Sequence, residues 1–339
     1  MQRYTSIGQQ RIARATPRST TASDLNKEFR QHVISGLSAS PKKLSSRYFY
    51  DATGDRLFQG IMASPDYYLT RCEDEILRTY SGAIAEALAG DAEHFEVIEL
   101  GAGDGSKTAR LLAQWISDGR QPLYRPVDIS ANAIGSLKNT LSYRLPSLKI
   151  DGLQGEYHAA LERIGVTKGT HRTFLFLGSN IGNMDHDVAV QLLRKITARM
   201  QGGDRLMIGL DLKKDPRVIL RAYDDRAGVT REFNLNLLHR INRELGANFD
   251  VDAFMHAPVY DPENGRALSY LVSKTDQQVK IPGAPRPFEF RAWESIHTET
   301  SQKYDMPQVN ALACEAGLQV IESFSDRKRY FADIVLGLK

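Results

Sequence analysis

The sequence predicts an α/β protein in which a doubly wound, mostly parallel sheet carries a discontinuous second domain. Three observations lead to this fold class. An apolar strand at residues 95–100 runs directly into a glycine-rich turn and then into a helix. A helix at residues 309–317 precedes two strands that would close the sheet as a hairpin. Residues 213–304 separate these two parts, and a segment of that length is an insertion rather than a loop.

The turn Gly101-Ala-Gly103-Asp-Gly105 carries the first functional signal. Glycines at alternate positions let the backbone turn sharply and come close to a bound nucleotide. Glu99 stands just before the turn, which is the pattern of S-adenosylmethionine (SAM) methyltransferases, and a carboxylate suits the cationic sulfonium of SAM. Dinucleotide dehydrogenases instead use G-x-G-x-x-G to seat a pyrophosphate. A Rossmann-like SAM fold is therefore favoured over a nicotinamide-binding fold.

Hydrophobic periodicity and turn signals predict the remaining elements in order. Residues 42–70 are rich in aromatic residues and turn formers, which is compatible with a packed aromatic loop. A third strand region is expected to end near residues 155–157. The expected helices cover residues 24–40, 73–88, 186–200, 230–245 and 309–317. The further expected strands cover residues 124–130, 173–177, 205–210, 267–273, 288–294, 318–324 and 330–338.

These elements divide the chain into two domains and a tail. Residues 24–70 and 213–304 are expected to form a substrate-binding domain. Residues 71–212 and 305–339 are expected to form the SAM-binding methyltransferase domain. Residues 1–23 are rich in arginine, serine and threonine, as transit peptides are, but they lack a clear apolar face. A disordered basic tail is therefore the favoured interpretation.

Composition restricts the classes of partner. The chain of 339 residues has 42% hydrophobic and 25% charged residues, as ordinary globular proteins do. A net charge of +3 is too small to indicate nucleic acid or an anionic membrane, and no apolar run reaches the length of a membrane span. Cys72 and Cys314 lie far apart, without metal-ligand spacing, so two reduced thiols and no metal site are expected. We expect a cytoplasmic monomer that acts on a small molecule.

Two polar residues follow strand ends at the ligand-binding edge. Asp128 ends the strand that follows the glycine turn, where an acidic residue usually grips the ribose hydroxyls of a nucleotide. Asn183 closes the turn Gly178-Ser-Asn-Ile-Gly-Asn after the strand at residues 173–177. A polar turn at the end of that strand would face the substrate. Asp128 could instead cap a helix, and Asn183 could simply serve the turn.

Eight sequence blocks, taken together, resemble one family. They are YFYDATGDRLFQGI, SPDYYLTR, ELGAGDGSKT, PVDIS, LGSNIGN, DLKKD, AYDDRAGVTREFNLNLLHRINRELGANFD and TETSQKY, in this order. The chain is similar, over roughly residues 24–339, to the histidine-specific Nα-methyltransferases of ergothioneine biosynthesis. The wider family includes members that methylate other amino acids, so the family and the substrate are separate questions.

The resemblance implies a set of SAM-binding residues. Gly101 and Lys107 would line the methionine end of SAM, with Gly103 in the same turn, and Asp128 would hold the ribose. Glu156 and Tyr157 would contact the adenine. Glu156 departs from the aspartate expected there, although a glutamate can still accept a hydrogen bond from the adenine amino group.

The resemblance also implies a substrate site. Tyr50, Tyr67, Asn183 and Tyr223 would hold the amino-acid backbone. On an extended segment, Glu299 and Ser301 would face the same way and bind the imidazole ring, although Glu299 could instead be a solvated charge at a strand end. An ungapped alignment places Ser269 where the histidine enzymes have a methionine against the imidazole. This smaller, polar residue changes the volume and the polarity of the pocket.

The expected reaction is a displacement at the methyl carbon of SAM by the neutral α-amine. L-Histidine would become Nα,Nα,Nα-trimethylhistidine (hercynine). A phenol with a pKa near 10 is a poor base at neutral pH, so Tyr50 and Asn183 are expected to orient the amine. The proton would leave through water or before binding. Two alternatives stay open: methylation of another, aromatic amino acid, and a protein that binds SAM without catalysis.

Overall fold

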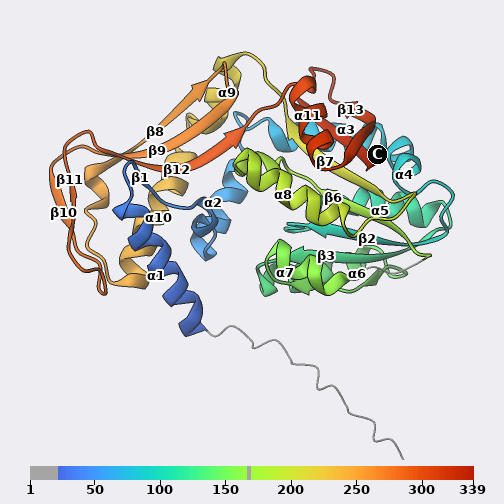
Figure 1. The fold of residues 1–339 in the computed structure, drawn as a ribbon, viewed down its shortest axis with the longest axis horizontal. Helices are drawn as coiled ribbons and strands as arrows, with labels where there is room; N and C mark the ends of the chain where they lie inside the picture. The colour runs from blue at the N-terminus through green and yellow to red at the C-terminus, as the bar shows by residue number, and fades with distance from the viewer. Residues whose placement is uncertain (1–21, 166–168) are drawn as a thin grey trace, which may run out of the picture.

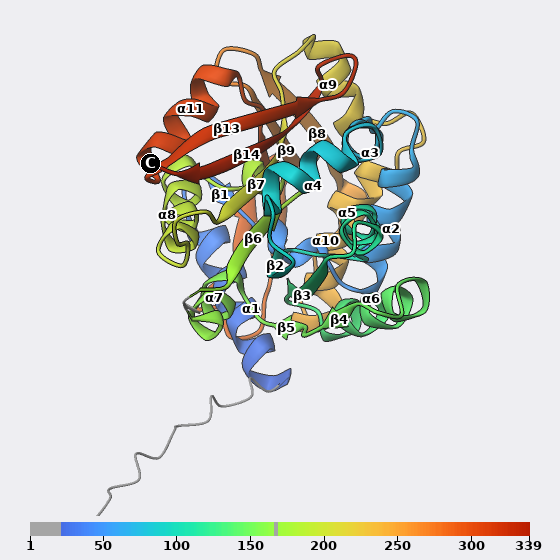
Figure 2. The ribbon, with the colours of Figure 1, turned by 90° about the vertical axis from the view of Figure 1, so that its right-hand side faces the viewer.

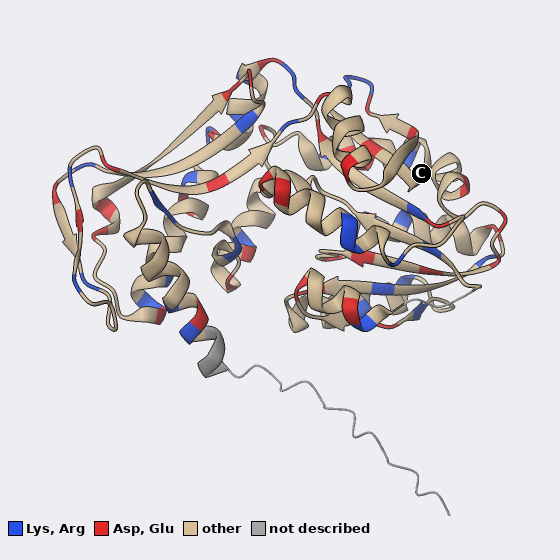
Figure 3. Cartoon of the chain, viewed as in Figure 1, with Lys and Arg blue, Asp and Glu red and all other residues tan. Residues whose placement is uncertain are grey.

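The structure, a computed structural model, describes residues 22–165 and 169–339. The chain forms two lobes, and each lobe is built around its own sheet (Figure 1). The basic tail expected at residues 1–23 lies outside the described residues, apart from the two positions that begin helix α1 (Ala22–Ser38). Charges of both signs are scattered over both lobes (Figure 3). Among the described residues, no helix is long and apolar enough to cross a membrane.

The larger sheet has eight strands in the order β13-β14-β7-β6-β2-β3-β4, with β5 also paired to β3. The pairs between β2, β3, β4, β5, β6 and β7 are parallel. Strand β14 pairs antiparallel with both β7 and β13, so the predicted closing hairpin is confirmed. The strands are β2 (His94–Leu100), β3 (Gln121–Asp128), β4 (Lys149–Ile150), β5 (Leu153–Gln154), β6 (His171–Phe176), β7 (Arg205–Asp211), β13 (Leu318–Ser325) and β14 (Phe331–Leu338).

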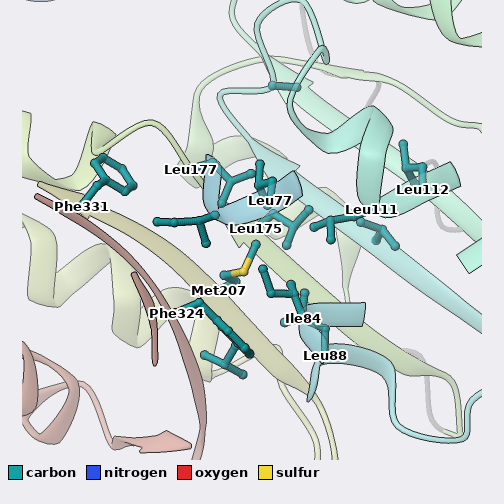
Figure 4. Packing of buried hydrophobic residues seen from close by; sticks show 14 of the residues in the cluster. Leu77, Ile84, Leu88, Leu111, Leu112, Leu175, Leu177, Met207, Phe324 and Phe331 are labelled. Carbon is teal, nitrogen blue, oxygen red and sulfur yellow. The ribbon is translucent and has the colours of Figure 1, made fainter. Parts of the chain in front are cut away.

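Helices cover both faces of this sheet, which explains why its strands are almost continuously apolar. Figure 2 shows α3, α4 and α5 on one side and α7, α8 and α11 on the other. Along β6, Leu175 packs into one core and Phe174 and Phe176 into the other. Figure 4 shows Leu175 and Met207 packed against helix residues such as Ile84. The helices are α3 (Leu69–Thr79), α4 (Ser81–Ala89), α5 (Thr108–Ser117), α6 (Ala131–Arg144), α7 (Tyr157–Ile164), α8 (His186–Thr197) and α11 (Met306–Glu315).

The smaller lobe is assembled from two distant parts of the chain. Its four-stranded sheet has the order β1-β12-β9-β8. Its core joins Phe29, Val33 and Phe49 from the N-terminal part to Leu237 and Leu271 from the middle of the chain. Its strands and helices are α1, β1 (Lys42–Lys43), η1 (Ser46–Phe49), α2 (Ala52–Ala63), α9 (Pro216–Tyr223), α10 (Val229–Leu245), β8 (Phe254–Asp261), β9 (Arg266–Ser273), β10 (Gln277–Val279), β11 (Phe288–Phe290) and β12 (Ser295–Gln302).

Three expectations for local structure are wrong. The single helix expected at residues 73–88 is broken at Tyr80, which lies between α3 and α4. The aromatic segment 42–70 is largely helical rather than a loop, because Asp51 caps α2 by accepting a hydrogen bond from the Gly54 N–H. The strand expected at 288–294 ends early as β11.

Candidate functional site

The glycine turn lies between the end of β2 and the start of α5. Gly101 and Gly103 have φ values of +72° and +55°, in the left-handed region that favours glycine. A Cβ on Gly101 would stand 2.7 Å from the Tyr157 hydroxyl, whereas a Cβ on Gly103 would meet nothing within 4 Å. The turn is therefore closed on one side by a tyrosine and open on the other.

Asp128 ends β3 beside this turn. Its Oδ2 accepts a hydrogen bond from the Gly103 N–H at 3.2 Å, and its Oδ1 accepts one from the Ser130 N–H at 2.9 Å. Ser130, not Asp128, is the cap of α6, because its hydroxyl accepts from the Ala133 N–H. The alternative role of Asp128 as a helix cap is therefore wrong. A half-buried carboxylate next to open glycine backbone fits the ribose hydroxyls of SAM.

Glu99 is buried next to this turn. Its carboxylate is buried and accepts hydrogen bonds from the hydroxyls of Thr108, at 2.6 Å, and Tyr124. Burial raises the pKa of Glu99 to about 7. The side chain joins β2, β3 and α5 beneath the turn, so it supports the loop instead of meeting a sulfonium.

Lys107 lies beneath the neighbouring turn at Gly178. Its Nζ is 2.5 Å from Glu73 Oε2, and it would stand 3.1 Å from a Cβ on Gly178. Burial lowers the pKa of Lys107, but the surrounding carboxylates, Glu73 foremost, together raise it above its usual value. Glu73 Oε1 also accepts a hydrogen bond from the Gly178 N–H at 2.7 Å. The pair thus holds together the two ligand-edge turns.

Glu156 and Tyr157 begin α7 at the same edge. The Tyr157 ring packs edge-to-face on Phe176, with ring centroids 5.4 Å apart. Glu156 is exposed and forms an ion pair with Arg47 of η1, with Nη2 and Oε1 3.0 Å apart. This contact brings the N-terminal part of the smaller lobe to the cofactor edge.

A small pocket adjoins the glycine turn. Asn180, on its wall, also lies next to Gly101. Six of the seven predicted substrate residues line this pocket, although they come from distant segments. They are Tyr50, Tyr67, Asn183, Tyr223, Glu299 and Ser301.

Tyr50 is positioned by its neighbour Asp51. The Asp51 carboxylate accepts hydrogen bonds from the Gly54 N–H at 2.7 Å and from Asn236 of α10 at 2.9 Å. Gly54 must lack a side chain, because a Cβ there would stand 1.8 Å from the Phe49 carbonyl oxygen. The Tyr50 ring then packs edge-to-face against Phe58 and Phe233, and 39% of the residue is exposed.

Asn183 and Tyr223 end two short helices, and both residues line the pocket. Asn183 is the last residue of η2 (Asn180–Asn183) and is exposed. Tyr223 ends α9, which starts at an Asp215 cap followed by Pro216. Burial raises the pKa of Tyr223 well above 10, so its hydroxyl keeps its proton at neutral pH.

Glu299 and Ser301 lie on β12, as an extended segment requires. A β-bulge between His297 and Glu299 interrupts the pairing with β9. The bulge lets Thr298 turn inward as well, where its hydroxyl donates to Asn234 of α10 at 2.9 Å. Burial raises the pKa of Glu299 to about 7, although nearby Lys303 opposes the shift. Glu299 lies within the strand and faces the pocket, so the alternative of a solvated strand-end charge is wrong.

Ser269 lies beside Glu299 and is not one of the residues that line the pocket. The two residues are direct partners across β9 and β12. Ser269 is 1% exposed, and its hydroxyl lowers the pKa of Glu299 without a hydrogen bond of normal geometry. The residue beside the Glu299 carboxylate is therefore small and polar.

Several residues of the site escaped sequence analysis. Phe58 and Phe233 supply apolar walls, and Asn180 faces both Gly101 and the pocket. Lys303 and Asp211 lie behind the pocket wall in full burial. Each of the five lies within a sequence block that carried the family resemblance, which was the available signal; only the three-dimensional contacts reveal what each does.

Comparisons with known proteins agree on one family. The family described as histidine-specific, SAM-dependent methyltransferases matches residues 29–338. Histidine N-alpha-methyltransferase of Mycobacterium tuberculosis is 37% identical over 297 residues, which cover 88% of this chain and 91% of that protein. Ergothioneine biosynthesis protein 1 of Schizosaccharomyces pombe is 30% identical over 77% of this chain and 34% of its own length. N-methyltransferase fsqC of Aspergillus fumigatus is 30% identical over 86% of this chain and 78% of its own length.

Proposed function

Because the chain belongs to the family of SAM-dependent, histidine-specific methyltransferases, we propose that it methylates the α-amino nitrogen of L-histidine to give hercynine. The observation that carries this proposal is the pair Glu299 and Ser301, which place a carboxylate and a hydroxyl in one pocket beside the glycine turn. A carboxylate accepts a hydrogen bond from a ring N–H, and a hydroxyl can donate one to the other ring nitrogen. These two groups suit an imidazole.

The proposed SAM site follows the ligand edge of the larger sheet. Gly101, Gly103 and Lys107 would hold the methionine end, Asp128 the ribose, and Glu156 with Tyr157 the adenine. Open backbone at Gly103 and the two-point anchoring of Asp128 support this assignment. SAM, when bound there, supplies an electrophilic methyl carbon. The chain contributes alignment and exclusion of water, and alignment alone can supply roughly 7–11 kcal/mol of a barrier.

Tyr50, Tyr67, Asn183 and Tyr223 are proposed to hold the amino-acid backbone, with Tyr50 and Asn183 orienting the amine. The amine must be neutral to attack. Burial keeps the Tyr223 phenol protonated, which makes it a weak base. We therefore propose that the substrate amine loses its proton to water in the pocket, or to solvent before it binds. Three successive transfers further require space for two methyl groups beside the nitrogen.

The domain boundaries are proposed in the same terms. Residues 24–70 and 213–304 would bind the substrate, and residues 71–212 and 305–339 would bind SAM. The separate core of the smaller lobe supports this division. Ala222, Tyr223 and Ala267, however, pack with the core of the larger lobe, so the two parts meet at the pocket. We also propose a cytoplasmic monomer; the two free cysteines fit a reducing compartment.

A second candidate function is Nα-methylation of another amino acid. Ser269 favours it, because a small, hydroxylated residue beside Glu299 leaves space and polarity for a differently shaped side chain. An aromatic substrate without a ring N–H would leave the Glu299 carboxylate without a donor, which is costly in a buried site.

Incubation with SAM and each of the twenty amino acids separately, followed by mass spectrometry, tests both candidates. Histidine should gain three methyl groups, and phenylalanine should remain nearly unmodified. If another amino acid is methylated faster, the histidine assignment fails and the methyltransferase assignment survives. If SAM binds in a calorimeter and no amino acid is methylated, the chain binds SAM without this catalysis.

A further inference from the structure

Lys303 is a buried cation directly behind the pocket wall. It follows β12, and its side chain is 0% exposed. Its Nζ lies 2.6 Å from the Tyr223 hydroxyl, 2.8 Å from Ser301 Oγ and 2.8 Å from Asp211 Oδ2. A lysine ammonium has three protons and no lone pair. These three contacts therefore use all of its protons.

The contacts of Lys303 determine whether the hydroxyl oxygens of Tyr223 and Ser301 accept hydrogen bonds. Because Lys303 can only donate, the oxygens of Tyr223 and Ser301 both accept from it. The Tyr223 oxygen thus receives a hydrogen bond from Lys303, and its single proton is left for a group in the pocket. Tyr223 is a donor toward the ligand.

Lys303 and Lys214 share one carboxylate, that of Asp211, at Nζ–O distances of 2.8 Å and 2.5 Å. All three side chains are at most 4% exposed, and burial lowers the pKa of Lys214. Tyr68 adds a hydroxyl donor to the same Asp211 carboxylate. Glu299 senses the charge of Lys303 but forms no ion pair with it.

A buried charge is costly unless it is paired and hydrogen-bonded, and Lys303 meets both conditions through Asp211 and two pocket hydroxyls. The positive side of the network meets the pocket at Tyr223 and Ser301, whereas Lys214 contacts Tyr68 and the Leu212 carbonyl oxygen. We propose that Lys303, anchored by Asp211, is a positioning residue that makes Tyr223 a hydrogen-bond donor and attracts the carboxylate of the amino-acid substrate. This inference rests on the proposed function only in taking a free amino acid as the substrate.

The test compares ligands with and without the carboxylate. L-Histidine and histamine share the ring and the amine, and only histidine has the carboxylate. Their binding to the full chain, saturated with S-adenosylhomocysteine, is measured by calorimetry. The test variant is Lys303→Met, which leaves Asp211 paired with Lys214. The matched control is Lys214→Met, which removes the other ammonium from the same carboxylate but touches no pocket hydroxyl.

Wild type should bind histidine at least about tenfold more tightly than histamine, as charge-assisted hydrogen bonds predict. Lys303→Met should reduce this preference to about threefold or less, and Lys214→Met should keep it within about twofold of wild type. An unchanged preference in Lys303→Met overturns the proposal. An equal loss in both variants also overturns it, because Lys303 would then only neutralise Asp211.

Two further measurements keep the outcome clear. If Lys303→Met does not fold, as judged by melting and by S-adenosylhomocysteine affinity, Tyr223→Phe removes the hydroxyl through which Lys303 acts. Tyr223→Phe must then lower the same preference, and an intact preference contradicts the proposal. If wild type selects another amino acid, the comparison is made between that amino acid and its decarboxylated amine. Failure of the histidine assignment is thereby separated from failure of the Lys303 assignment.

Discussion

The cofactor edge is shaped mainly by backbone groups, and the substrate pocket is shaped mainly by side chains. The cofactor edge is a backbone structure, in which Gly101 and Gly103 adopt positive φ values and Asp128 accepts hydrogen bonds from two backbone N–H groups. The pocket is a side-chain structure, assembled from α2, η2, α9 and β12. A backbone site is fixed by local conformation, whereas a side-chain site can change its ligand through one substitution. The residues of the cofactor edge and the residues that select the substrate therefore belong to separate parts of the molecule.

Asn183→Ala should break the pocket without affecting the cofactor edge, and it has the largest expected effect. Among the described residues, the Asn183 side chain forms no hydrogen bond with the protein, so its removal strands no buried partner. Loss of alignment at the reacting amine should cut turnover by about a hundredfold. SAM affinity, measured by calorimetry, should stay within about twofold of wild type. A parallel fall in both quantities would assign Asn183 to the cofactor site or to the fold.

Asp128→Ala should weaken SAM binding at the cofactor edge without affecting the substrate pocket. Loss of charge-assisted hydrogen bonds worth about 1.5–3 kcal/mol should lower SAM affinity by at least tenfold. Asp128→Asn is the matched control, since its amide oxygen can still accept from the Gly103 N–H. Thermal melting checks that the turn remains folded. Unchanged SAM affinity in Asp128→Ala would refute the ribose assignment.

The pocket should also respond to pH, through Glu299. Glu299, with a pKa of about 7, is ionised and accepts a ring N–H above that pH, and it is protonated below it. Between pH 7 and pH 6 the ionised fraction falls several-fold, so KM for histidine should rise by about fivefold through this group. Glu299→Gln keeps an acceptor and cannot titrate, so its KM should rise only through the protonation of histidine itself. Identical KM profiles for the two enzymes would exclude Glu299 from ring binding.

The smallest effect is expected where the two regions touch at the surface. Arg47 and Glu156 are exposed by 41% and 59%, and such ion pairs contribute about 0–1 kcal/mol. Arg47→Ala should therefore change SAM affinity by less than about fivefold and melting only slightly. Added salt should change SAM affinity less in the variant than in wild type. A tenfold loss of affinity would show that Arg47 contributes to the adenine site directly.

Sequence analysis predicted the cofactor edge more completely than the substrate pocket, because the residues of the cofactor edge are closer together in the chain. The strand, turn and helix around Gly101 are contiguous, so their pattern predicts both the fold and the position of Asp128. The contacts of Lys303 with Tyr223 and Asp211 join residues far apart in the chain, and no local pattern reports them. Glu99 shows the limit of motif interpretation, since its position indicates a SAM-binding pattern but does not predict its contacts with the Thr108 and Tyr124 hydroxyls.

Ser269 and the bulge of β12 show a second limit. An alignment places Ser269 near the ring-binding residues, but only the register with Glu299 places it beside the carboxylate rather than on the wall. Alternation along β12 predicts that Glu299 and Ser301 share a face, which is confirmed. It does not predict the extra inward residue Thr298, because a bulge depends on the partner strand and on Asn234 of α10.

The two-part core of the smaller lobe has a consequence for synthesis on the ribosome. The apolar face of α1, with Phe29, Val33 and Leu37, is covered by residues such as Leu237 and Ile241 of α10. Roughly 200 residues separate these segments, so at about 5–20 residues per second α1 waits on the order of 10–40 s for its partner. During that interval the nascent chain exposes an unpaired apolar helix. The smaller lobe can therefore complete its core only after α10 has left the ribosome.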